Sequence, residues 1–318
     1  MIVAHAERPD RAAGSPPPPG GTAPAEVIKA VRLRHPVRNL IAVVLAVYFV
    51  AFLWDASTRK AFQWDIYIKY LFDQRISAAA LVTIELTVLS MAIAAVLALL
   101  LTVMRLSSNP VFRSIAWFYV WIFRGTPVYV QLVFWGVLSL IYPTLQLGLP
   151  FLPPVISFAT GQALSFFALA VLGLALNEAA YLAEIVRAGI LSVDRGQEEA
   201  AIALGMSWGQ SMWRIVIPQS MRVIIPPTGN EFISMLKTTS LVTAVPFSLD
   251  LYARSRDISA ETFTPIPLLL DASTWYLFMT SVLMVGQYFL EKRFARGISS
   301  ARPEKAAAAP DTREEAIG

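Results

Sequence analysis

The sequence predicts an all-α fold, a polytopic membrane bundle of about six transmembrane helices. Of the 318 residues, 56% are hydrophobic and only 15% are charged, against roughly 25% charged in an average soluble protein. Long apolar stretches also follow one another, and a helix of about 20 apolar residues crosses a membrane core of about 30 Å. One soluble core of this chain length could not bury so much apolar surface.

Several classes of site are excluded by the residues that the chain lacks. It contains no cysteine and only two histidines, His5 and His35. Disulfides, thiolate metal ligands and histidine-based catalytic sites in the apolar body are therefore ruled out. The net charge of +4 is better explained by basic loops on one side of a membrane than by nucleic-acid binding. We expect no catalytic residue, no metal, no cofactor and no nucleic-acid partner.

The N-terminal part of the chain differs from the rest. Residues 1–38 are predicted to form a disordered cytoplasmic tail, because the proline-rich run 15–21 suits neither a helix nor a strand interior. The tail ends in a basic collar that contains Lys29, Arg32, Arg34 and Arg38. Residues 39–55 are predicted to form an additional N-terminal transmembrane helix.

Further spans are predicted between the two tails, and together they form a transmembrane domain at 76–295. They are expected at 76–104, 114–141, 161–190, 222–245 and 272–290. The proline-rich segment 145–158 is expected to be a short re-entrant or surface segment. Residues 297–318, rich in Ala, Glu, Lys and Pro, are predicted to be a disordered C-terminal tail. Lys and Arg are biased towards one side of six spans, which places both termini in the cytoplasm.

The segment 192–221 is a long amphipathic connection between two spans. Its first part is rich in good helix formers and ends at Gly205, which suits a helix C-terminus. Ser207 is predicted to begin a second short helix, which Pro218 is expected to end. The residues alone allow two interpretations, a helical loop packed on its own bundle or a docking surface for another protein.

Four stretches of the sequence contain motifs. Within 192–221, Glu199, Ala200 and Ala201 are followed by three residues, Gly205, nine residues, Ile215 and Pro218. The other three stretches are 123–127 (FRGTP), 180–190 (AYLAEIVRAGI) and 237–241 (KTTSL). The first pattern resembles the EAA loop motif of bacterial ABC importer permeases, with Ile217 here in place of the usual Leu, and the other three resemble elements of the polar amino-acid uptake family. A pattern with several fixed gaps is far more specific than a short motif, and the resemblance covers about residues 70–295.

The resemblance implies a type I importer permease fold in which segment 192–221 is a coupling-helix loop. It also implies protein partners: two copies of a cytoplasmic ATP-binding subunit, a second permease subunit in a homo- or heterodimer, and an extracytoplasmic solute-binding protein. The chain would lie in the lipid bilayer of the bacterial inner membrane and move a polar amino acid by alternating access. The chain itself is not expected to be an enzyme, since ATP hydrolysis would belong to the separate subunit. The sequence accordingly contains no phosphate-binding GxxxxGK[ST] motif.

Polar residues inside the spans are candidates for the substrate pathway, because charges in lipid are costly and mostly functional. Arg124 lies near the middle of its span, beside a Gly and a Pro that break the helix. Glu178 has no oppositely charged residue at helical spacing. The offsets between Asn230, Ser234 and Lys237 predict that these three share one helix face. The full set of candidates is Arg124, Thr126, Asn177, Glu178, Asn230, Ser234 and Lys237.

The same polar residues also allow a structural interpretation. Arg124 could pair with Glu178 and brace the bundle. The polar stripe in the fifth span could be a hydrogen-bonded seam between helices. Glu184 and Arg187 are three residues apart and are expected to form a structural ion pair on one helix face.

Two transport classes remain open from the residues. One is the ABC importer permease, and the alternative is an ion-coupled secondary transporter of a small polar solute. A non-transporting scaffold would not need the charges inside the spans, and an enzyme is the least expected class. The segment 192–221 favours the importer, because an ion-coupled transporter needs no docking loop.

Overall fold

The structure, a computed structural model, describes residues 36–148 and 154–294. The tails predicted at 1–38 and 297–318 lie outside the described residues, except that positions 36–38 belong to a helix. The chain divides into two units, 1–58 and 59–318.

The first unit contains one described helix, α1 (Pro36–Thr58). It extends the helix predicted at 39–55 by about one turn at its N-terminus. At 1.5 Å per residue its 23 residues are long enough to cross a membrane core.

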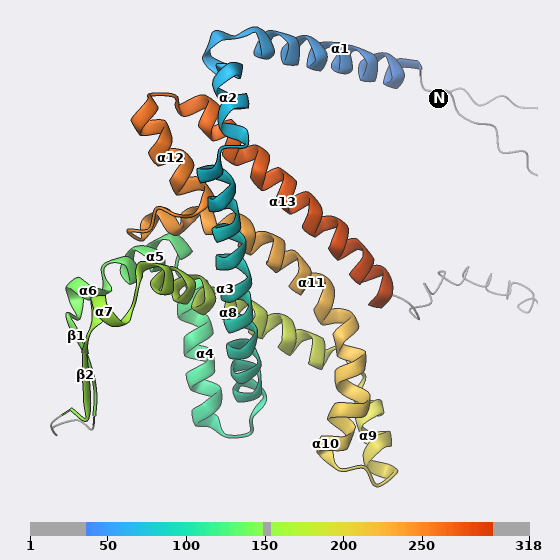
Figure 1. Ribbon diagram of the computed structural model, residues 1–318. Coiled ribbons are helices and arrows are strands. Elements are labelled where there is room, and N and C mark those ends of the chain that lie inside the picture. The colour runs from blue at the N-terminus through green and yellow to red at the C-terminus, as the bar shows by residue number, and fades with distance from the viewer. Residues whose placement is uncertain (1–35, 149–153, 295–318) are drawn as a thin grey trace, which may run out of the picture. The chain divides into compact units, whose positions relative to one another are not determined.

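The second unit contains the rest of the described chain, and its regular secondary structure is helical apart from one hairpin (Figure 1). The α-helices are α2 (Trp64–Leu71), α3 (Gln74–Leu106), α4 (Pro110–Gly125), α5 (Val128–Gly136), α6 (Leu138–Ile141), α7 (Thr160–Ala163), α8 (Phe166–Leu191), α9 (Arg195–Ala203), α10 (Trp208–Ser211), α11 (Ile217–Thr238), α12 (Leu251–Thr262) and α13 (Pro265–Phe294). Shorter helical turns are the 3-10 segments η1 (Lys60–Phe62) and η3 (Thr239–Ala244) and the π-helical segment η2 (Met212–Val216).

The predicted spans appear in two forms. In the described ranges, the helices α1, α3, α8 and α13 are by themselves long and apolar enough to cross a membrane. The span expected at 114–141 is instead divided between α4 and α5, which meet at Pro127. The span expected at 222–245 lies in α11, which is 22 residues long but less apolar. The structure therefore confirms a helical membrane bundle and shows that one of its spans is broken.

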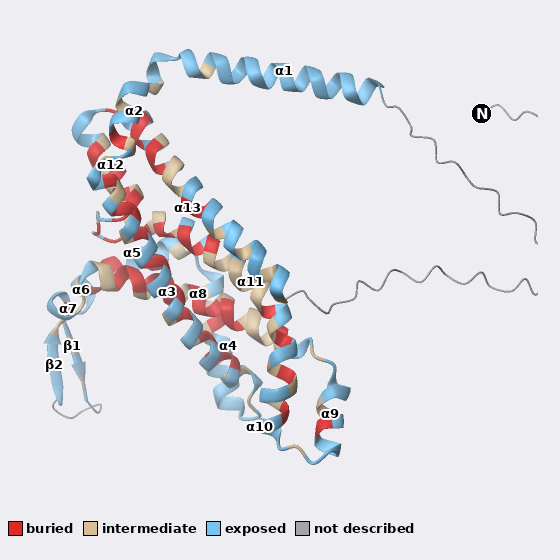
Figure 2. Cartoon of the chain, turned by 45° about the vertical axis from the view of Figure 1, so that its right-hand side comes forward, coloured by how far each residue is buried: buried red, intermediate tan, exposed pale blue. Residues whose placement is uncertain are grey.

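The core forms where α3 and α8 lie side by side (Figure 2). Small buried residues such as Ala94, Ala98 and Ala179 belong to the main apolar cluster, and small side chains let helix backbones approach closely. Thr102 Oγ1 donates to the carbonyl of Ala183 at 3.0 Å, which adds a direct hydrogen bond between the two helices. The two helices thus provide a rigid frame for the polar residues on α8.

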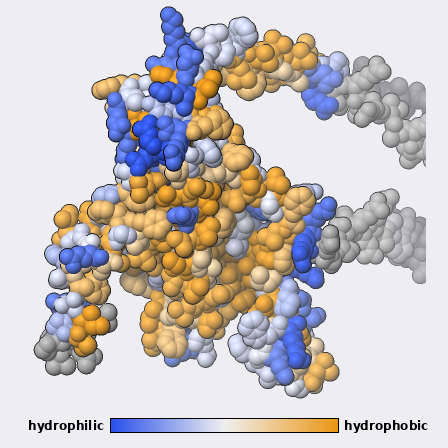
Figure 3. Space-filling view, viewed as in Figure 1, coloured by the Kyte–Doolittle hydropathy of each residue, from blue (hydrophilic) through white to orange (hydrophobic). Residues whose placement is uncertain are grey.

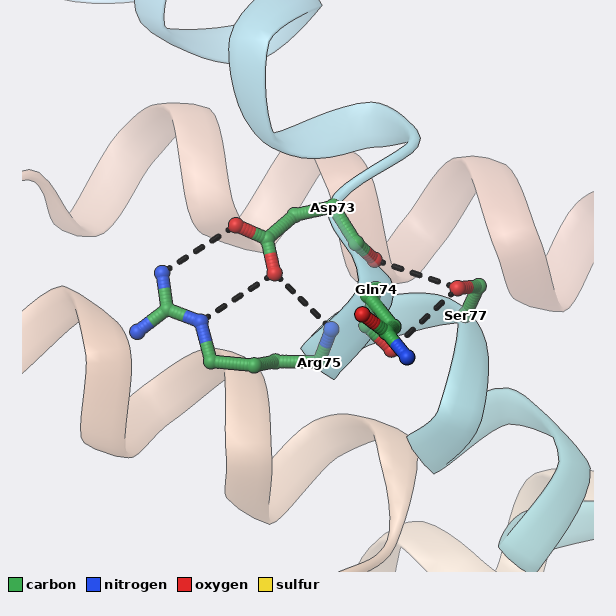
Figure 4. A network of polar contacts seen from close by, with 4 residues as sticks. All are labelled: Asp73, Gln74, Arg75 and Ser77. Carbon is green, nitrogen blue, oxygen red and sulfur yellow. Dashed lines mark hydrogen bonds and ion pairs between the residues drawn. The ribbon is translucent and has the colours of Figure 1, made fainter.

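A second apolar cluster joins α2, the start of α3, α12 and α13. The carboxylate of Asp73 caps α3 by accepting from the backbone N–H of Arg75 at 2.8 Å (Figure 4). The Arg75 guanidinium also donates to both oxygens of this carboxylate. These hydrogen bonds hold the pKa of Asp73 below its usual value. The cap by Asp73 therefore determines the residue at which the long helix α3 begins.

The surface of the second unit has the distribution expected in a bilayer. Apolar side chains cover the middle of the bundle, and hydrophilic side chains gather over α2 and α12 at one end and over α9 and α10 at the other (Figure 3). Leu277, Phe278 and Val282 on α13 are among the exposed apolar residues. In a bilayer, such an apolar belt contacts the lipid tails.

The segment expected at 145–158 contains a β-hairpin, which departs from the all-α prediction. Strand β1 (Thr144–Leu147) pairs antiparallel with β2 (Ile156–Ala159), with Thr144 opposite Ala159. The aromatic and β-branched residues of β2 favour a strand.

Candidate functional site

A cavity of about 530 Å³ lies between the α4–α5 break, the middle of α8 and the last turns of α11. Its polar lining residues are Arg124, Thr126, Asn177, Glu178, Tyr181, Glu231, Ser234 and Thr238. Five of the predicted pathway residues therefore meet at one place, although they come from helices far apart in the sequence.

The charged groups of this cavity are two carboxyl groups and one guanidinium. The Arg124 guanidinium lies 5.2 Å from the centre of the Tyr181 ring, a cation–π contact. Glu178 is buried, and its Oε1 atom has no hydrogen-bond partner among the described residues. Glu231 on α11 faces the same cavity. The suggested brace between Arg124 and Glu178 is absent from the ion pairs of residues 36–148 and 154–294.

Thr126 and Asn177 are held by neighbouring protein groups. The Thr126 hydroxyl donates to the carbonyl of Ile122 at 2.9 Å. Asn177 Nδ2 donates to the carbonyl of Phe123 at 2.9 Å and to Oε1 of Gln131 at 3.2 Å. Asn177 thus connects α8 to the end of α4 and to α5, and the hydroxyl of Thr126 is bonded to the last turn of α4.

Asn230, Ser234 and Lys237, the predicted stripe on α11, have different neighbours. Ser234 lines the cavity described above. Lys237 lines a different cavity of about 710 Å³, next to α12 and α13. Asn230 accepts a hydrogen bond from Gln287 on α13 at 2.9 Å. The three residues extend over about 10 Å of α11 at 1.5 Å per residue, so they contact different neighbours along the helix.

Sequence reasoning missed Tyr181, Glu231, Thr238 and Gln131. Tyr181 follows Glu178 by three residues, which places it on the same face of α8. Glu231, Ser234 and Thr238 likewise follow one another at helical spacing along α11. This periodicity could have found three of the four, whereas Gln131 is recognisable only once α4 and α5 are seen to separate.

Glu184 lies at the centre of an ion-pair network. The Arg187 guanidinium contacts Glu184 Oε2 at 2.8 Å, as their spacing predicts. Arg105 on α3 contacts the other oxygen, Oε1, at 3.2 Å. Arg105 is 79 residues away in sequence, so its part in the network depends on the packing of α3 against α8.

The segment 192–221 forms a separate projection at one end of the bundle (Figure 1). Helix α9 ends in a Schellman motif: the N–H of Gly205 bonds to Ile202 O at 2.9 Å, and that of Met206 bonds to Ala201 O at 3.1 Å. Gly205 has a φ of 80°, a conformation that suits glycine. The left-handed backbone of Gly205 therefore ends α9 where the sequence predicts the helix to end.

The predicted end of the second helix at Pro218 is wrong. Ser207 begins α10 with a capping box, but the chain then continues through η2 into α11 without leaving helical conformation. The N–H of Ile217 bonds five residues back to Met212 O. Pro218 thus falls in the first turn of α11, where a missing N–H costs little.

The motif residues of this loop differ in exposure. Glu199, Ala200, Gly205 and Pro218 are exposed, Ile215 is half-buried and Ala201 is buried. Large apolar side chains also project from the loop, with Leu204 84% and Trp213 73% exposed. Such a cluster on a short helical projection is suited to contact with another protein.

Comparison with known proteins gives a consistent result. Residues 91–296 match the family described as binding-protein-dependent transport system inner membrane component. The chain is 54% identical over 282 residues to the arginine transport system permease protein ArgU of Corynebacterium glutamicum, covering 88% of this chain and 87% of that protein. It is 32% identical to the L-cystine transport system permease protein TcyB of Bacillus subtilis, covering 75% of this chain and 94% of TcyB.

Solved structures agree with these relatives. A crystal structure of an amino acid ABC transporter with histidines contains a chain that is 31% identical, with a TM-score of 0.59, and the match covers 73% of this chain and 98% of that one. The MetNI methionine ABC transporter contains a chain with the same fold at 13% identity and a TM-score of 0.55. The alternative of an ion-coupled secondary transporter is wrong, because the matched family depends on a binding protein. The chain belongs to the binding-protein-dependent transport system inner membrane components, the permease subunits of ABC importers.

Proposed function

We propose that this permease moves a polar amino acid, with arginine as the first candidate, into the cell by alternating access. The proposal is supported by the relative named for arginine transport and by the charges of the cavity at the α4–α5 break. Arginine carries one carboxylate and two cationic groups. The cavity provides one guanidinium, Arg124, and two carboxyl groups, Glu178 and Glu231, and this matching set of charges is the observation that carries the proposal.

Each charged group has a role in this proposal. Arg124 binds the substrate carboxylate, and Tyr181 supports the guanidinium from behind. Glu178 and Glu231 bind the two cationic groups of the substrate, and the hydroxyl of Ser234 adds a polar contact. A buried Glu178 without a partner is costly, so a cationic ligand would supply the missing interaction. Lys237 and Asn230 lie outside this cavity and are assigned to the neighbouring parts of the pathway.

The energy for transport enters at the segment 192–221. We infer that Glu199, Ala200 and Gly205 dock on a cytoplasmic ATP-binding subunit, with one such subunit for each of two permeases. Ala201, Ile215 and the start of α11 at Pro218 hold the docking helix on its own bundle. ATP hydrolysis then belongs to the partner, and the second permease is either another copy of this chain or a related one. Both termini lie in the cytoplasm, and an extracytoplasmic binding protein delivers the substrate.

Uptake by the reconstituted complex tests the substrate assignment. Glu178→Gln is expected to raise the KM for arginine by about tenfold, because one charge-assisted contact is lost. Citrulline has the shape of arginine without the cationic side chain, so a smaller change in its KM would assign Glu178 to the guanidinium of arginine, and an equal change would assign it to the α-ammonium. The matched control is Glu85→Gln, which changes an exposed carboxylate on α3 outside the cavity. Equal uptake of arginine by Glu178→Gln and the unaltered complex would contradict the assignment.

Association with the ATP-binding subunit tests the coupling assignment separately. Glu199→Lys reverses an exposed charge on α9 and is expected to weaken association and substrate-stimulated ATP hydrolysis. Glu261→Lys makes the same change at the other end of the bundle, on α12, and should leave both measurements unchanged. Normal ATP hydrolysis by the Glu199→Lys complex would exclude docking at α9.

A further inference from the structure

At the break between α4 and α5 the backbone carbonyl of Phe123 lacks its helical donor. In an α-helix the carbonyl of residue i accepts from the N–H of residue i+4. For Phe123 this donor would be residue 127, which is proline and has no N–H. Phe123 directly precedes Arg124, so the unpaired carbonyl lies at the base of the side chain that faces the cavity.

Two side-chain amides replace the missing donor. Gln131 Nε2 on α5 donates to Phe123 O at 3.1 Å and is shared with Thr126 O at 3.1 Å and Thr126 Oγ1 at 2.7 Å. Asn177 Nδ2 on α8 donates to the same Phe123 carbonyl at 2.9 Å and to Gln131 Oε1 at 3.2 Å. Gln131 is only 9% exposed. The end of α4 is therefore tied to α5 and α8 by one buried cluster of amides.

This cluster holds the turn at a place that side-chain packing leaves open. A Cβ atom at Gly125 would meet nothing within 4 Å, so the turn after Arg124 is not packed on that side. Among the described residues, an apolar side chain at 131 would leave Phe123 O with Asn177 as its side-chain donor and would remove the donor of Thr126 O, so the turn would lose its tie to α5 and rearrange. Such a rearrangement moves the Cα of Arg124.

We propose that Gln131, supported by Asn177, is a positioning residue that holds Arg124 in place for the substrate carboxylate. Gln131 does not line the cavity, whereas Arg124 and Thr126 do, so Gln131 acts on the ligand through Arg124. The inference rests on the proposed function, since it takes Arg124 as the group that binds the carboxylate. A displacement of about 1 Å at a binding group is enough to change recognition by one to two orders of magnitude.

Cysteine labelling tests whether Gln131 holds the break. The chain has no cysteine, so Gly125→Cys creates a single reactive site in an open position at the break. Gln131→Met removes the amide and keeps an unbranched side chain of similar length. We expect it to change the maleimide labelling rate of the full chain carrying Gly125→Cys by about threefold or more, because the turn loses its fixed hydrogen bonds.

The matched control is Gln287→Met, which removes an amide that also joins two helices, α11 and α13. It should leave the labelling rate at position 125 unchanged. If Gln131→Met does not fold, Gln131→Leu provides the same test, since it also removes the Nε2 donor and fills the site with a different apolar shape. An unchanged labelling rate in a folded Gln131 variant overturns the proposal.

Ligand selectivity tests whether this position matters for recognition. Agmatine is arginine without its carboxylate, so binding of agmatine does not depend on Arg124. In the purified transporter complex without binding protein, Gln131→Met should reduce the preference for arginine over agmatine by about tenfold, whereas Gln287→Met should not. Equal weakening of both ligands indicates a purely structural role and overturns the proposal. If the unaltered complex recognises neither ligand, the proposed function fails, while the labelling result still decides whether Gln131 holds the break.

Discussion

Gly205 meets two requirements of the loop that can be separated experimentally. Its left-handed backbone completes the Schellman motif at the end of α9. The space around its Cα is open in the isolated chain, so a partner protein could approach closely there. A left-handed conformation costs most L-residues about 1–2 kcal/mol, but asparagine adopts it readily.

Two substitutions at Gly205 distinguish backbone strain from a blocked surface. Gly205→Ala is expected to lower the free energy of unfolding by about 1 kcal/mol, measured by thermal unfolding in detergent. Gly205→Asn should unfold at nearly the same temperature as the unaltered chain, because Asn accepts the conformation. Both should weaken association with the ATP-binding subunit, since both place a side chain on the docking surface. Normal association of the Gly205→Asn chain would show that no close approach occurs.

Asp250 is a buried carboxyl group outside the long apolar helices. It caps α12 by accepting from the backbone N–H groups of Tyr252 at 3.1 Å and Ala253 at 3.2 Å. Its Oδ1 atom is buried without a hydrogen-bond partner among the described residues. Burial raises the pKa of Asp250 to about 6, although the two N–H groups partly offset this effect.

The raised pKa of Asp250 predicts a pH dependence of stability. Between about pH 4 and pH 6 the folded chain holds this proton more tightly than the unfolded chain, so stability falls as pH rises through that interval. Asp250→Asn keeps the cap and removes the charge. We expect it to raise stability at pH 7.5 by about 2 kcal/mol and to flatten the pH dependence of the unfolding temperature. A variant with the same pH dependence as the unaltered chain would assign that dependence to other groups.

At the scale of elements, Gly189 lets the end of α8 contact α11 directly. A Cβ atom at this position would lie 2.3 Å from Ile224 Cγ1, so the two helices are closer here than a side chain allows. Both helices border the segment 192–221, one before it and one after it. Their contact therefore holds the base of the docking loop.

A substitution at Gly189 should separate these helices. Gly189→Ala is expected to destabilise the chain by about 1–3 kcal/mol, the usual range for overpacking. The double variant Gly189→Ala with Ile224→Ala should relieve this clash, because alanine lacks both Cγ1 and Cδ1, the two atoms of Ile224 that meet the added Cβ. Gly286→Ala on α13 is the control, since a Cβ there meets nothing within 4 Å. Thermal unfolding of the four chains measures the effect, and equal unfolding temperatures at positions 189 and 286 would contradict it.

The sequence predicted elements whose cause is local and missed those that depend on packing. The length of the apolar runs in the sequence was enough to predict α3, α8 and α13. The Gly and Pro beside Arg124 indicated a broken helix. The pairing of Arg105 with Glu184 could not be predicted, because it joins residues on different helices. Pro218 was misjudged because a change of hydrogen-bond register at η2 places it where a proline is tolerated. The cavity that Lys237 lines could not be predicted, because α11 borders two cavities.

At the scale of the whole molecule, one helical path joins the docking loop to the cavity. From Trp208 to Thr238 the chain is helical without interruption, and its far end provides Ser234 and Thr238 to the cavity wall. The α11 portion alone is about 33 Å long at 1.5 Å per residue. A movement imposed on the loop would therefore reach the wall of the cavity through a continuous element.

The same geometry predicts that the hairpin and the docking loop lie on opposite sides of the membrane. The hairpin precedes α8 and the loop follows it, and the 26 residues of α8 span about 39 Å, more than the hydrocarbon core. The absence of cysteine from the sequence allows one reporter to be placed at each site. Val155→Cys and Trp208→Cys replace side chains that are 83% and 68% exposed.

Labelling of intact cells with a membrane-impermeant maleimide distinguishes the two sides. The chain with Val155→Cys should be labelled in intact cells, because an extracytoplasmic position is accessible from outside. The chain with Trp208→Cys should be labelled only after the membrane is permeabilised. Labelling of both positions from the same side would exclude α8 as a complete span. The reverse pattern would place the loop outside, where no ATP-binding subunit could reach it, and would overturn the proposed coupling.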